Sequence, residues 1–169
     1  MKIYSIRREQ FVQRSLDDVF RMFERPEDLS LITPPSMDFI LLSPRPIEKK
    51  AGTLMDFAVR VFGVRFHWMA MITDYQRPYR FVDVQIKGPY TFWHHTHLFD
   101  ESEKGTNIVD EVRYVLPFGI LGRLLHALLV RRRIERIFDY RAKVIARNFA
   151  LQSDQAAAPD CAAVGGISR

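Results

Sequence analysis

The sequence lacks the features that would cross-link a small fold or place it in a membrane. Its 169 residues include one cysteine, Cys161, so neither a disulfide framework nor a cysteine-based zinc site can form. No uninterrupted apolar run approaches the roughly 20 residues that a membrane span requires. The first residues, MKIYSIRR, contain no apolar signal-peptide core. We therefore expect a cytoplasmic protein whose 47% apolar and 27% charged residues suit one globular domain.

Positive charge is concentrated in one part of the chain. The formal net charge is +5, yet residues 118–150 hold eight basic residues against two acidic ones. No nucleic-acid-binding motif surrounds them, so we expect no nucleic-acid partner. The run Arg131, Arg132 and Arg133 is typical of the solvated face of a helix. It also suits transient contact with an anionic membrane surface, which would make the protein peripheral to the membrane.

Proline, glycine and polar clusters divide the first two thirds of the chain into short segments. Ser15 has the character of a helix N-cap, because acidic residues follow it and the apolar residues of 16–23 share one helical face. Pro26 ends this helix, and residues 27–32 add a further turn. Runs rich in β-branched and aromatic residues predict strands at residues 3–15, 37–42, 53–62, 64–75 and 80–87.

Alternation within these strands predicts which side chains share a face. Trp68 belongs to the inner face of its strand, and an even-length turn brings Phe81, Asp83 and Gln85 to the same face. The opposite assignment, with the valines and isoleucine of residues 80–87 facing the core, leaves Asp83 and Gln85 in solvent.

Residues 88–116 predict a β-hairpin with a polar connection of about four residues. If Asp100 lies opposite Gly105, the cross-strand pairs are Phe99 with Thr106, His97 with Ile108, His95 with Asp110, Trp93 with Val112, and Thr91 with Tyr114. All these residues share one face, which mixes aromatic rings with two histidines and a carboxylate. Such a face is typical of a semi-polar cavity wall.

After residues 117–119 the apolar period changes from two to about 3.6, which predicts a long amphipathic helix with a bend near Val130. Its apolar positions are Leu121, Leu124, Leu125, Leu128, Ile134, Ile137, Phe138, Val144, Ile145 and Phe149. The domain spans residues 1–150, and the small-residue segment 151–169 is predicted to be a disordered tail. The order of elements indicates an α+β fold in which a curved, seven-stranded antiparallel sheet wraps around the C-terminal helix.

Several local stretches within residues 1–150 form a characteristic set. They are Leu29, residues 32–35 and 52–53, Trp68, residues 72–73 and 81–90, Trp93, His95, His97, Phe99, residues 105–106, Asp110, Tyr114, and residues 117–119, 121–122 and 138–141. With the order of elements, this set resembles the START-like or Bet v 1-like superfamily of helix-grip proteins. Within it, the chain is similar to bacterial ligand-binding SRPBCC domain proteins, related to the polyketide cyclase/dehydrase and coenzyme Q-binding branches.

The resemblance implies a cavity between sheet and helix that binds an apolar or amphipathic small molecule, such as a lipid, a quinone or a polyketide-like compound. It does not imply one reaction. The candidate ligand-binding residues are Trp68, Phe81, Asp83, Gln85, Trp93, His95, His97, Phe99, Tyr114, Phe138 and Arg141. Arg141 lies one helical turn from Phe138, where it can pair with a ligand carboxylate or with an acidic residue of its own helix.

His95 and Asp110 offer acid–base chemistry, with Tyr114 as a further donor, as in a cyclase or dehydratase. The alternative is that Asp110 only satisfies a buried histidine and fixes the strand register. His95 and His97 project to the same side of a strand, as metal ligands do, and Asp110 would be a third ligand. Since zinc usually needs more, we expect neither a metal nor another cofactor.

Overall fold

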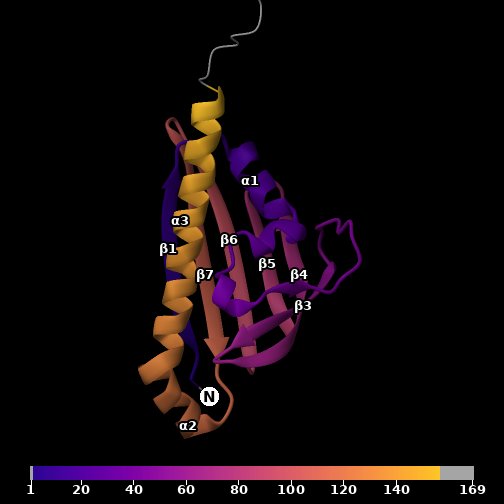
Figure 1. Ribbon diagram of the computed structural model, residues 1–169, viewed down its shortest axis with the longest axis vertical. Helices are drawn as coiled ribbons and strands as arrows, with labels where there is room; N and C mark the ends of the chain where they lie inside the picture. Colours follow the sequence, from indigo (N-terminus) through magenta and orange to yellow (C-terminus); the bar gives the residue numbers. More distant parts are fainter. Residues whose placement is uncertain (1, 157–169) are drawn as a thin grey trace, which may run out of the picture.

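The computed structural model describes residues 2–156, with the backbone alone at positions 121, 123, 125, 127 and 151–156. Its framework is one antiparallel sheet in the order β1-β7-β6-β5-β4-β3-β2. The strands are β1 (Tyr4–Val12), β2 (Ile40–Leu41), β3 (Leu54–Val61), β4 (Val64–Gln76), β5 (Arg80–Lys87), β6 (Phe92–Ser102) and β7 (Gly105–Val115). Figure 1 shows the long helix α3 (Arg131–Ala156) lying lengthwise over one face of this sheet. The predicted α+β architecture with seven antiparallel strands is confirmed.

Helix α1 (Leu16–Glu24) begins where the sequence predicts. The Ser15 hydroxyl accepts a hydrogen bond from the backbone N–H of Asp18 at 3.2 Å, which satisfies one of the donors left free at a helix start. Pro26 opens the short 3₁₀ helix η1 (Pro26–Ser30), the further turn that was predicted. The strand predicted at 37–42 is wrong in its first half. There, Pro35 starts a second 3₁₀ turn, η2 (Pro35–Met37), and Asp38 has a left-handed φ of 45°, so only β2 is extended.

The C-terminal helical region changes geometry along its length. It begins as α2 (Gly119–Leu125), continues as the π-helical segment η3 (His126–Val130) and ends as α3. Figure 1 shows α2 at an angle to α3, so the direction changes near the predicted bend. No helix among the described residues combines the length and the apolar character that crossing a membrane requires.

Only the later part of the predicted apolar stripe is buried. Ile134, Phe138, Ile145 and Phe149 are buried, but Leu124 and Leu128 are each 57% exposed. A π-helical turn holds more residues than an α-helical turn, so it rotates the faces on either side of it relative to each other. The side chains of Leu121 and Leu125 lie outside the described residues, as do residues 157–169 of the predicted tail. Helix α3 itself includes 151–156.

The β6–β7 hairpin differs from its predicted register by two residues. Ser102, not Asp100, pairs with Gly105, which leaves a two-residue turn. His97 therefore lies opposite Asp110, and Trp93 lies opposite Tyr114. A Cβ atom at Gly105 would lie 2.2 Å from the Val12 carbonyl oxygen, so the close approach of β1 requires glycine. Because the slip is two residues, every side chain stays on its predicted face.

Two packed clusters hold the sheet and the helices together. The larger one contains Phe20 of α1, Phe99 of β6 and Ile145 of α3. The smaller one joins Tyr114 of β7 to Ile134 and Phe138 of α3. The space between the sheet and the first half of α3 is therefore bounded by packed side chains at both ends.

Phe99 and Phe92 provide a matched test of this packing on one strand. Phe99 has no exposed surface, and its ring centroid lies 5.1 Å from those of Phe20 and Phe23. Phe92 is 40% exposed. Phe99→Ala should lower the free energy of unfolding by about 3–5 kcal/mol, and Phe92→Ala by less than about 1 kcal/mol, measured by urea denaturation. Similar losses for the two variants would contradict the assigned faces of β6.

Candidate functional site

A cavity of about 1170 Å³, counting the open space at its mouth, lies between the sheet, α3 and the segment that follows α1. Eight of the predicted site residues line it: Trp68, Phe81, Asp83, Trp93, His95, His97, Phe138 and Arg141. Asp83 pairs with Ile72 of β4 and with His95 of β6, so it belongs to the face of the sheet that meets the helix. The alternative in which Asp83 is solvated is therefore wrong.

Three other predicted residues support the walls without lining the cavity. Gln85 is hydrogen-bonded to the backbone of Tyr90 through both its amide nitrogen and its oxygen, at 2.7 and 3.3 Å. Phe99 is part of the larger packed cluster. The hydroxyl of Tyr114 lies 2.9 Å from Nε2 of His126, a residue that the sequence did not single out. This hydrogen bond joins β7 to the π-helical segment.

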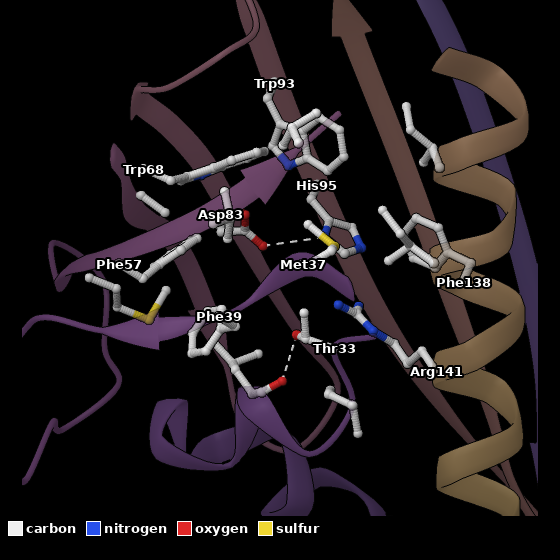
Figure 2. A pocket seen from close by; sticks show the side chains of 18 of the residues that line it. Thr33, Met37, Phe39, Phe57, Trp68, Asp83, Trp93, His95, Phe138 and Arg141 are labelled. Carbon is white, nitrogen blue, oxygen red and sulfur yellow. Dashed lines mark hydrogen bonds and ion pairs between the residues drawn. The ribbon is translucent and has the colours of Figure 1, made fainter. Parts of the chain in front are cut away.

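Aromatic side chains make up one wall of the cavity. The rings of Trp68 and Trp93 meet edge to face with centroids 5.3 Å apart. Phe57 stacks on Trp68 at 5.9 Å, and Tyr90 lies 4.8 Å from Trp93. Figure 2 shows Trp68 and Trp93 above Met37 and Phe39. Such flat apolar surfaces suit a ring or an acyl chain.

The segment that connects α1 to β3 supplies lining residues that sequence patterns missed. Thr33, Met37 and Phe39 lie on one side of the cavity, and Lys49 contributes an amino group from the loop before β3. Met37 and Phe39 were assigned to a strand, and Lys49 stands in a polar stretch with no periodicity. The local sequence pattern does not predict that these residues line the cavity, because the path of the α1–β3 connection over the sheet brings them to it.

Next to these aromatic residues, the same face of the sheet carries a buried polar network. Oδ1 of Asp110 lies 2.8 Å from Nε2 of His95 and 2.8 Å from Nδ1 of His97. Oδ2 of Asp83 lies 3.2 Å from Nε2 of His97 and 3.5 Å from Nδ1 of His95. The two imidazole rings are 3.8 Å apart. The predicted contact between His95 and Asp110 is therefore present, and Asp83 joins the same network on its other side.

Mutual hydrogen bonding sets the ionisation of this network. Burial raises the pKa of Asp110, but the charge of His97 and hydrogen bonds with both imidazoles outweigh it and hold the pKa well below 3.8. Burial also opposes ionisation of Asp83, yet the hydrogen bond with His97 and the nearby histidine and lysine charges leave its pKa lowered. Burial and the neighbouring His97 lower the pKa of His95. Both carboxylates are thus ionised at neutral pH, and burial favours the uncharged form of His95.

Two cationic side chains complete the polar part of the cavity. The Lys49 ammonium donates to the carbonyl of Phe23 and lies 4.1 Å from the centre of the Phe81 ring. Burial lowers the pKa of Lys49 to about 8. Arg141 reaches the cavity from α3, and its Nη1 lies 3.9 Å from Oδ1 of Asp110. The cavity is therefore an apolar space with one strongly polar wall.

Asp83, His95 and His97 also lie close enough together to suggest metal ligands, since one donor atom from each falls within 4.8 Å of the others. Asp83, rather than the expected Asp110, completes this set. The same atoms already face one another within hydrogen-bonding reach, and Lys49 adds positive charge beside Asp83. We therefore describe the cluster as a hydrogen-bonded network.

Removing the shared carboxylate should cost stability. Asp110→Asn leaves two buried imidazoles without their common anionic partner, and we expect the free energy of unfolding near neutral pH to fall by about 3–5 kcal/mol. Asp100→Asn, an exposed position on β6, is the matched control. The stability that Asp110 contributes is fully present above its usual pKa of 3.8 and is lost as pH falls toward its lower folded value.

The lowered pKa of His95 also reduces stability in acid. As pH falls below 6.5, the unfolded chain binds a proton at this histidine before the folded protein does. The wild-type protein should therefore lose stability on acidification, and the Asp110→Asn variant should lose less of it below about pH 4. Urea titrations at several pH values measure both effects. Parallel curves for wild type and variant would refute the assigned charge state of Asp110.

Comparison with known proteins identifies the architecture. No protein-family model matches the sequence, and no curated protein does so either. Among solved structures, TTHA0849 from Thermus thermophilus has a TM-score of 0.67 at 17% identity, over 89% of this chain and 99% of that one. The di-domain ARO/CYC StfQ from the steffimycin biosynthetic pathway has a TM-score of 0.68 at 13% identity, over 90% and 52%.

A third structure, Ara h 8.0201, has a TM-score of 0.58 at 10% identity, over 85% of this chain and 98% of that one. At such low identities the likeness shows the fold alone. The chain has a Bet v 1-like helix-grip fold, as its resemblance implied.

Proposed function

We propose that the protein binds or carries an apolar or amphipathic small molecule, of the lipid, quinone or polyketide-like kind, in the cavity between the sheet and α3. The observation that carries this proposal is the cavity itself, in which the aromatic side chains of Trp68, Trp93 and Phe57 lie beside a compact polar network. Ligand sites are usually mostly apolar spaces with a few placed polar groups. The Bet v 1-like fold supports the same proposal by analogy.

Binding is favoured over cyclase or dehydratase chemistry by the surroundings of the histidines. Both ring nitrogens of His95 face carboxylate oxygens, at 2.8 and 3.5 Å, and the same holds for His97. A general base needs a nitrogen that can reach the proton of a substrate. Within the network, the carboxylate oxygens of Asp83 and Asp110 stand at these nitrogens and limit the approach of a substrate, so we favour a structural role for His95 with Asp110.

Filling the cavity should abolish binding. Ala70 lines the cavity on β4 and is 2% exposed, so Ala70→Phe places a ring inside it. We expect the affinity for the neutral fluorophore N-phenyl-1-naphthylamine to fall by at least about tenfold, at a stability cost of about 1–3 kcal/mol. Probe fluorescence and quenching of tryptophan emission both report binding, since Trp68 and Trp93, the two tryptophans, line the cavity.

Thr73→Phe is the matched control, because Thr73 is exposed on the same strand. The control should bind the fluorophore like the wild type. Equal binding by all three proteins would place the fluorophore elsewhere and contradict the proposal.

A second candidate function, docking on an anionic membrane, is favoured by exposed apolar side chains at the helical corner. Ile120, Leu124, Leu128 and Leu129 are each at least 50% exposed around α2 and η3, directly before the arginine run. Single exposed apolar residues are common on protein surfaces, but a group of this size indicates a contact surface. The arginines themselves are partly engaged, since Arg131 donates to Glu135 and Arg133 donates to the carbonyl of Arg60. The apolar corner, with basic residues beside it, is therefore the proposed contact with lipid.

Vesicle flotation tests this candidate. The double variant Leu124→Ser, Leu128→Ser should reduce binding to phosphatidylglycerol-containing vesicles by more than about tenfold, because each leucine would otherwise bury apolar surface in the bilayer. Ile86→Ser, an exposed apolar position on β5, is the control. Retained flotation of the double variant, or equal flotation on purely zwitterionic vesicles, counts against an anionic membrane as the partner.

A further inference from the structure

Arg141 is a cavity-lining cation whose buried Nε–H has no acceptor among the described residues. Its side chain is 14% exposed and extends from α3 to the lining of the cavity (Figure 2). Its Nε atom is buried and has no hydrogen-bond partner among the described residues. Its one carboxylate neighbour in ion-pair range, Asp110, lies 3.9 Å from Nη1, beyond hydrogen-bond length. A guanidinium has five donors, and leaving them unpaired in a low-dielectric site costs free energy.

The other cations of the cavity differ in this respect. Lys49 donates to the Phe23 carbonyl. Arg133, near the β3–β4 turn, also has a buried Nε without a hydrogen-bond partner among the described residues, but its Nη2 donates to the carbonyl of Arg60 at 3.2 Å and its guanidinium lies over the ring of Phe62. Both are therefore at least partly satisfied by the protein itself. Among the described residues, Arg141 has as neighbours the carboxylate of Asp110, 3.9 Å away, and the ring of Phe138, whose centre lies 5.2 Å from the guanidinium carbon.

The carboxylates near Arg141 are committed elsewhere. Oδ1 of Asp110 lies 2.8 Å from a nitrogen of each imidazole, and Asp83 faces the same two rings from the other side. Neither carboxylate is therefore available to neutralise Arg141 at close range. The partner that fits a planar guanidinium fork is an oxyanion that can accept two parallel hydrogen bonds. Because Arg141 lines the cavity, that oxyanion can belong to the bound molecule.

We propose that the ligand of this cavity is an amphipathic acid whose carboxylate binds Arg141 while its apolar body packs against the aromatic wall. This proposal rests on the proposed function, since it assigns the chemistry of one end of the same ligand. Lys49 also lines the cavity, and its positive charge interacts with that of Arg141 and favours an anion nearby. Asp83 repels an anion, but its hydrogen bond with His97 and the charge of Lys49 offset this repulsion. The carboxylate of the ligand should therefore bind at the α3 side of the network, away from Asp83 on β5.

A set of probes that differ only in the polar end tests the assignment. Decanoic acid, decanol and decylamine share one chain, and at about pH 7 the acid is anionic and the amine cationic. Quenching of Trp68 and Trp93 emission gives the affinity of each probe for the whole protein. The wild type should bind decanoic acid roughly 10- to 100-fold more tightly than decanol. This ratio corresponds to the free energy of hydrogen bonds to a charged group.

Variants of Arg141 separate this contact from cavity binding in general. Arg141→Met should remove the preference for the acid and leave the affinity for decanol unchanged. Arg141→Lys should keep part of the preference, because the charge remains and the fork is lost. Arg136→Met, at an exposed position on the same helix, should behave like the wild type. Circular dichroism establishes that each variant is folded, and Arg141→Gln replaces Arg141→Met if the latter is not.

The outcomes distinguish the two proposals. If the wild type binds decanol and decanoic acid equally, prefers decylamine, or keeps its preference for the acid in the Arg141 variants, the carboxylate assignment is overturned and cavity binding stands. If none of the three probes changes the tryptophan emission of the wild type, both proposals fail.

Discussion

The structure depends on one constraint: ionised carboxylates can be buried only where they are fully paired. Asp110 and Asp83 meet this condition by sharing two imidazoles, which lie side by side on β6 between them. The network crosses β5, β6 and β7, three neighbouring strands of the sheet. A one-residue slip of any of them would turn its polar side chain to the other face and separate a carboxylate from its imidazoles. The network therefore adds to the backbone hydrogen bonds in fixing the register of these strands.

The same network explains why the lining of the cavity has an aromatic part and a polar part. Side chains that face the helix from β6 alternate with outward ones, so Trp93, His95, His97 and Phe99 form one continuous row. Trp93 meets Trp68 of β4, and Phe99 meets Phe20 and Phe23 of α1. The histidines lie between these two apolar groups. A molecule in the cavity would meet aromatic surface at one end and polar groups near the middle of the sheet.

Much of this arrangement follows from the sequence because its causes are local. The period-2 alternation of β6 and β7 predicts their shared face, and the N-cap of α1 is visible in Ser15. The hairpin register is not determined in this way, since a two-residue and a four-residue turn both preserve the alternation. The contact between His95 and Asp110 survives the error because an oxygen at one position of an antiparallel pair reaches both its direct partner and a diagonal one. Lys49, Met37 and Phe39 could not be predicted, since the path of the long connection between α1 and β3 decides their place.

The position of Arg141 follows from the geometry of the helix above the sheet. Ile134, Phe138, Arg141 and Ile145 are three or four residues apart, so they lie along one face of α3. Three of them are buried against the sheet. The fourth, Arg141, is the one charged residue among these four. A methionine would pack there without the cost of desolvating a charge. The charge of Arg141 therefore does not serve the packing of α3, and the cavity in front of it is where that charge can act.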